Sequence, residues 1–176
     1  SSYFNVILTI TFCILLNLMG KVVADYCNLP LWMDSFGTVL SAYIFGPICG
    51  AIVGATVNII YGMFDTVSLI YAITNILIGI IIGVAAKHKV FETIFTTIST
   101  SVLLTIVSFI VSATFNMIFY DGMTGNVWGD GVINYLQEMK VSHILCVAAG
   151  EFYIDFLDKN ITLLALYIFI KLVRFI

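Results

Sequence analysis

Three acidic side chains and a lysine lie close together in the last third of the chain. Glu151, Asp155 and Asp158 occupy positions i, i+4 and i+7, so on a helix they project from one face, and Lys159 is placed to pair with Asp155. An ionisable group inside a membrane span costs about 2.5 to 3.5 kcal/mol, so such residues face a bundle interior or a water-filled cavity. Two interpretations follow. Either at least one acid lines a ligand pocket, or all lie at the outer interface, with Asp155 neutralised by Lys159.

Two tryptophans are accompanied by polar residues that suit a small-molecule site. Trp128 lies upstream of the acidic group, near Asn126 and Asp130, and Trp32 and Asp34 belong to the first predicted loop. Small-molecule sites combine aromatic faces with a few convergent polar groups. The alternative is that each tryptophan belongs to the aromatic belt at the membrane interface.

The sequence lacks the motifs of common enzymes. It contains no HExxH, no GxSxG and no glycine-rich phosphate loop followed by lysine, and His88 and His143 fall on opposite sides in the predicted topology. The four cysteines occur singly: Cys13, Cys27, Cys49 and Cys146. We interpret them as apolar packing residues, with a Cys27–Cys146 disulfide as the alternative. We expect no enzyme activity, metal or cofactor, and the lack of a basic patch excludes a nucleic-acid partner.

Composition places the chain in a membrane. Of its 176 residues 61% are hydrophobic and 10% are charged, and the mean hydropathy is +1.12, so the charges could not cover a water-exposed surface. The apolar runs are continuous, which favours helices over the alternating strands of a barrel. At about 20 residues per crossing, we predict an all-α integral membrane fold, a six-transmembrane-helix bundle forming one membrane domain over residues 1–176. The predicted spans are about 4–24, 35–45, 47–63, 69–86, 90–120 and 143–172, with an outer loop at 121–142.

Small and polar residues at helical spacing predict which faces pack. Gly46 and Pro47 form a strong helix breaker, so the third helix should fold back on the second. Glycines recur every four or eight residues from Gly46 to Gly62, which leaves one face of this helix nearly bare for close packing. The fifth helix carries a polar stripe that must face protein or water: Ser101, Thr105, Ser108, Ser112 and Asn116.

The distribution of charge predicts the orientation. With six spans, all the basic residues of the connections and of the C-terminal end except Lys140 fall on one side, at Lys87, Lys89, Lys171 and Arg174. The other side carries mainly aspartates. Because basic residues favour the cytoplasmic side, both termini are predicted to be cytoplasmic.

The segment Leu29 to Gly62, LPLWMDSFGTVLSAYIFGPICGAIVGATVNIIYG, resembles the substrate-binding S components of energy-coupling factor (ECF) vitamin transporters. It shares a proline-containing first loop, a second helix that ends in a GP turn and a glycine-stepped third helix. The resemblance covers the whole chain in length and number of spans. One departure concerns the first helix, FNVILTITFCILLNLMGKVVA, which lacks the family's alanine-stepped docking motif. The chain is therefore a specialised member, or its partner interface lies along Gly46, Gly50 and Gly54.

The resemblance implies the substrate-binding subunit of an ABC importer in a prokaryotic plasma membrane. Such a subunit captures a vitamin or related micronutrient at the outer face. It topples in the bilayer and delivers the ligand inward with a membrane coupling subunit and two cytoplasmic ATPases. The acidic surroundings favour a ligand with a cationic or hydrogen-bond-donating group. The implied pocket residues are Trp32, Asp34, Asn75, Asn116, Trp128, Glu151 and Asp155. The alternatives are a membrane sensor or input module that binds a small ligand, and a structural protein whose glycine face forms a permanent oligomer.

Overall fold

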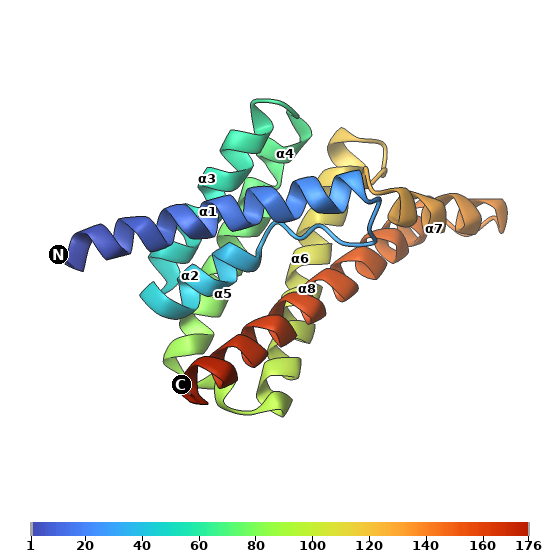
Figure 1. Cartoon of the computed structure of the whole chain (residues 1–176). Helices are drawn as coiled ribbons and strands as arrows, with labels where there is room; N and C mark the ends of the chain where they lie inside the picture. Colours follow the sequence, from blue (N-terminus) through green and yellow to red (C-terminus); the bar gives the residue numbers. More distant parts are fainter. Residues whose placement is uncertain (1, 176) are drawn as a thin grey trace.

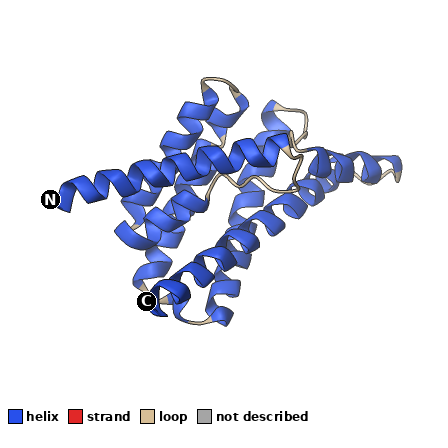
Figure 2. Cartoon of the chain, viewed as in Figure 1, coloured by secondary structure: helices blue, strands red, loops and turns tan. Residues whose placement is uncertain are grey.

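The chain forms a bundle of helices in the computed structural model, which describes residues 2–175 (Figures 1 and 2). No strand occurs among these residues, and the predicted all-α class is confirmed. The helices are α1 (Ser2–Tyr26), α2 (Phe36–Phe45), α3 (Pro47–Gly62), α4 (Val67–Ile70), α5 (Ala72–Lys87), the short 3-10 helix η1 (Val90–Glu92), α6 (Ile94–Phe119), α7 (Val127–Glu138) and α8 (His143–Phe175).

Three stretches within the described part are helical, long and apolar enough to cross a membrane: Tyr3–Tyr26, Val67–Lys87 and Ile94–Phe119. The second combines α4 and α5, which a single turn residue, Tyr71, separates. Helices α2 and α3 are apolar but shorter, and the long helix α8 carries the charged residues identified in the sequence. The predicted outer loop contains a helix, α7, that begins at Val127, whereas the sequence predicts only one or two amphipathic turns from Val132 to Met139.

The reversal between α2 and α3 forms at the predicted breaker. Gly46 has φ of 94°, a left-handed conformation that glycine adopts without strain, and Pro47 occupies the first turn of α3, where its missing N–H is not needed. Helix α3 consequently folds back onto α2, and a Cβ added to Gly50 would lie 2.5 Å from the Cβ of Ala42.

The glycine face of α3 packs against α5 inside the bundle. A Cβ added to Gly50 would lie 3.0 Å from the Cα of Gly79. A Cβ added to Gly54 would lie 2.6 Å from the carbonyl oxygen of Asn75. Helix α5 meets this face with its own glycines, so the two backbones approach closely. Gly50 and Gly54 are therefore covered by α2 and α5 of the chain itself, so a partner could reach them only if these helices moved. Gly46, the third residue of the predicted partner interface, has open space around it.

This packing predicts that Gly79→Val destabilises the fold. The new side chain would overlap the backbone of Gly50 and Ala51, and such overpacking costs about 1 to 3 kcal/mol. The thermal unfolding midpoint in detergent should fall clearly. The matched control is Gly131→Val in α7, where an added Cβ meets nothing within 4 Å. Equal midpoints for the two variants would contradict the close approach of α3 and α5.

The polar stripe of α6 faces protein, as predicted. Its five members are buried, and α6 packs along α8, where the Ser101 hydroxyl lies 2.7 Å from Asn160 Oδ1. All four cysteines are free, with Cys146 buried and Cys27 exposed, so the disulfide alternative is wrong.

The two ends of the bundle differ in charge. At one end Lys171 Nζ donates to the carbonyl oxygen of Glu92 at 3.0 Å, which brings the last part of α8 to the Lys87–Lys89 connection. In Figure 1 this end lies at the bottom, near the C-terminus. At the other end the Tyr61 hydroxyl donates to Asp25 Oδ2 at 2.7 Å, where α1 and α3 both finish. Basic residues thus gather at one end and aspartates at the other.

Candidate functional site

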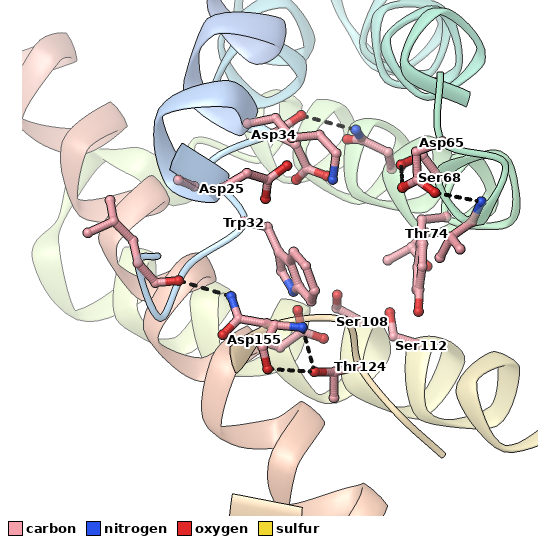
Figure 3. Close-up of a pocket in the computed structure, with 18 of the residues that line it drawn as sticks. Asp25, Trp32, Asp34, Asp65, Ser68, Thr74, Ser108, Ser112, Thr124 and Asp155 are labelled. Carbon is pink, nitrogen blue, oxygen red and sulfur yellow. Dashed lines mark hydrogen bonds between the residues drawn. The ribbon is translucent and has the colours of Figure 1, made fainter. Parts of the chain in front are cut away.

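A cavity of about 360 Å³ opens at the acidic end of the bundle (Figure 3). Helices α1, α4, α5, α6 and α8 form its walls, together with the connections 27–35 and 120–126. Its polar and aromatic lining includes Lys21, Asp25, Asn28, Trp32, Asp34, Asp65, Ser68, Tyr71, Thr74, Asn75, Ser108, Ser112, Thr124, Asn126, Asp155 and Lys159.

A buried carboxylate on α8 holds the 27–35 connection over this cavity. Asp158 Oδ1 accepts hydrogen bonds from the backbone N–H groups of Trp32 and Met33, at 3.1 and 2.9 Å. Its Oδ2 lies 2.6 Å from Lys159 Nζ. Asp158 thus fixes the backbone from which Trp32 reaches the cavity. Two further hydrogen bonds attach the 27–35 connection to the end of the 120–126 connection and the start of α7. Asn126 Nδ2 donates to the carbonyl oxygen of Leu29, and Trp128 Nε1 donates to the carbonyl oxygen of Asn28.

Lys159 forms ion pairs with two aspartates. Its Nζ lies 3.6 Å from Asp155 Oδ1, the pair predicted from the spacing, but it lies closer to Asp158. All three side chains are almost completely buried. The other oxygen of Asp155, Oδ2, has no hydrogen-bond partner among the described residues.

Three more polar atoms in residues of the cavity wall lack a hydrogen-bond partner. Thr74 Oγ1, Asn75 Oδ1 and Ser108 Oγ are buried and have no hydrogen bond within the described chain. Most buried polar groups in proteins are hydrogen-bonded, because an unpaired one keeps its full desolvation cost. Residues that line the cavity therefore hold four polar atoms whose hydrogen-bonding capacity the described chain leaves unused.

A second lysine enters the cavity from α1. Lys21 is 8% exposed, and its Nζ lies 4.7 Å from the ring centre of Tyr61 and 5.5 Å from that of Trp32. No carboxylate oxygen of the described residues lies within 4.0 Å of it. Asp34 lies nearby in the 27–35 connection, where burial raises its pKa above the ordinary value and the charges of Lys21 and Lys159 oppose this increase.

A hydrogen-bonded chain stands behind the wall. The Tyr71 hydroxyl donates to Asn116 Oδ1, and Asn116 Nδ2 donates to Glu151 Oε2 at 2.9 Å. Tyr71 lines the cavity, with its ring centre 6.4 Å from that of Trp32 and an interplanar angle of 30°. Asn116 and Glu151 therefore support an aromatic wall residue instead of facing the cavity themselves.

The predicted pocket residues separate into three groups. Trp32, Asp34, Asn75 and Asp155 line the cavity, and Asn116 and Glu151 lie behind it. Trp128 lies outside, contrary to the prediction. Its ring is half exposed on α7 and lines a shallow surface groove together with Tyr135 and Tyr153.

Sequence reasoning missed several wall residues. Lys21 carried a usable signal, because a lysine inside an otherwise apolar helix must have a polar environment. Tyr71 and Thr124 carried none, since their position depends on how α4, α5 and the 120–126 connection are arranged.

No group of three or more His, Cys, Asp or Glu side chains able to hold a metal ion occurs within residues 2–175. No protein-family model, curated protein or solved structure matches the chain. The fold and the site thus define an all-helical protein with a polar cavity at its acidic end and, among the described residues, three helical stretches that are long and apolar enough to cross a membrane.

Proposed function

We propose that the chain is the substrate-binding S component of an ECF-type importer, which captures a vitamin or related micronutrient. The observation that carries the proposal is the cavity at the acidic end, where four buried polar atoms have no partner among the described residues. Such a cavity, with aromatic walls and a few directed polar groups, suits a small organic ligand. The resemblance of Leu29 to Gly62 to S components supplies the transport role.

We further propose six membrane spans, formed by α1, α2, α3, the α4–α5 pair, α6 and α8. Helix α8 can cross despite its charges, because Glu151, Asp155, Asp158 and Lys159 are buried among other helices and do not face lipid. The collection of basic residues at the end opposite the cavity favours a cytoplasmic location for that end and for both termini. The cavity would then open toward the outer face.

Energy for import would come from partners, namely a membrane coupling subunit and two cytoplasmic ATPases. The sequence contains no nucleotide-binding motif of its own. The coupling subunit would contact a surface other than Gly50 and Gly54, because α5 covers these glycines. Toppling in the bilayer would carry the loaded cavity inward.

The proposal predicts ATP-dependent uptake. Cells that produce the chain with a coupling subunit and its ATPases should accumulate one compound from a set of labelled water-soluble vitamins. The control replaces the phosphate-loop lysine of the ATPases and should abolish accumulation. No uptake of any vitamin, together with no co-purification of the coupling subunit, would refute the transport role even if the purified chain retained a small molecule.

A further inference from the structure

We infer that the cavity binds an amphoteric small molecule, with an anionic group at Lys21 and an N–H donor group at Asp155. The inference rests on the proposed ligand-binding function and adds the chemical class of the ligand. It depends on two ends of the cavity, one at Lys21 and one at Asp155.

The first end is defined by Lys21. The ammonium group is held beside the Trp32 and Tyr61 rings and has no carboxylate within 4.0 Å among the described residues. The nearby Asp25 carboxylate already accepts a hydrogen bond from the Tyr61 hydroxyl. A buried ammonium has three donors and is costly without an acceptor. A carboxylate or phosphate oxygen of the ligand would provide a charge-assisted hydrogen bond there.

The second end offers an acceptor. Asp155 lines the cavity, and its buried Oδ2 has no hydrogen-bond partner within the described chain. Lys159 compensates Asp155 only in part, since it lies 1.0 Å closer to Asp158. Ser108, on α6, lies beside Asp155, and its hydroxyl can donate one hydrogen bond. A carboxylate can accept several, so Asp155 would still have room for a donor from the ligand. A protonated amine or an amino-substituted ring of the ligand would provide this donor.

The space between the two ends suits a flat molecular body. In the view of Figure 3, the Trp32 ring lies between Asp34 on one side and Ser108 and Asp155 on the other. The nearly parallel ring of Tyr71 completes an aromatic wall. A cavity of about 360 Å³ is at the small end of the range for ligand sites, which favours a molecule with one or two rings.

The charge of the lining excludes the simpler ligand classes. Aspartates outnumber lysines on the wall, so an acid without a donor group would meet uncompensated negative charge. A cation without an acid group would be repelled by Lys21 and would bring no acceptor to its ammonium, which acts on Asp34 only from beyond 4.0 Å. An amphoteric molecule satisfies both ends.

The test is native mass spectrometry of the purified chain after incubation with ultrafiltered yeast extract, a broad mixture of vitamins, amino acids and nucleosides. The retained compound should carry both a carboxylate or phosphate and at least one amino or other N–H group. Retention only of cations without an acid group, or only of acids without an N–H group, would overturn the inference and leave the ligand-binding role intact. Retention of no compound would refute the ligand-binding role itself.

A second measurement addresses Lys21 directly. The retained compound should bind the wild-type chain at least tenfold more tightly than its uncharged analogue, in which the carboxylate is an amide or the phosphate is removed. Lys21→Met should abolish this preference and leave the affinity for the uncharged analogue nearly unchanged. The matched control is Lys140→Met, at an exposed lysine before α8. Equal affinity of the wild-type chain for both compounds would overturn the anionic end, whether or not the Lys21 variant folds.

Discussion

Lys159→Met should destabilise the protein by about 3 to 5 kcal/mol, the range for a buried ion pair that loses one partner. The lysine is 2% exposed and neutralises two buried aspartates, Asp155 at 3.6 Å and Asp158 at 2.6 Å. Methionine fills a similar volume but leaves both carboxylates without a cation. Because Asp158 also holds the backbone of Trp32 and Met33, we expect the 27–35 connection to loosen together with α8.

The measurement is thermal unfolding in detergent of a background in which Cys27 and Cys49 are replaced by serine, read by the exposure of the buried cysteines Cys13 and Cys146 to a thiol-reactive dye. Lys171→Met provides the matched control, because Lys171 lies on the same helix and contacts only the exposed carbonyl of Glu92 and the ring of Tyr167, with no acidic partner within the described chain. Lys159→Arg, which keeps the charge, should lie between the wild-type chain and Lys159→Met. If Lys159→Met and Lys171→Met unfolded at the same temperature, the buried ion pairs would not stabilise the bundle.

Local patterns in the sequence were sufficient to predict most helices. Span boundaries follow from where apolar runs meet polar residues, and the Gly46-Pro47 turn follows from two residues with strict backbone preferences. The start of α7 was missed, because a short amphipathic helix at a membrane surface has a weaker apolar signal than a span. Its N-terminal cap is Asn126, whose side-chain oxygen accepts a hydrogen bond from the N–H of Trp128.

The site was only partly predictable, since spacing fixes a helical face but not the neighbour of that face. The four-residue spacing from Gly46 to Gly62 predicted close packing, and the partner turned out to be α5, whose Asn75, Gly79 and Gly83 repeat the same spacing. Likewise, the i, i+4 positions of Glu151 and Asp155 predicted one buried face, but only the tertiary arrangement directs Asp155 into the cavity and Glu151 behind Tyr71.

Asp155→Asn should weaken binding of the compound retained from yeast extract at least tenfold, which corresponds to about 1.4 kcal/mol. The substitution keeps the shape of the side chain and removes the negative charge that faces the cavity. The fold should persist, because Lys159 keeps its closer partner, Asp158. The dissociation constant can be measured by native mass spectrometry or calorimetry. Asp121→Asn, at an exposed aspartate of the 120–126 connection, is the matched control. An unchanged dissociation constant would reject Asp155 as a ligand contact.

Glu151 should respond differently, because it acts on the cavity through two other residues. Glu151→Gln still offers an oxygen to Asn116 Nδ2 and should change binding little, whereas Glu151→Ala frees Asn116 and, through it, the Tyr71 hydroxyl. Substitutions within one hydrogen-bonded chain do not have additive effects on the binding free energy. Glu151→Ala combined with Tyr71→Phe should therefore weaken binding no more than the stronger single change. Additive losses would instead place Glu151 in direct contact with the ligand, and the side chain would then have to turn toward the cavity on binding.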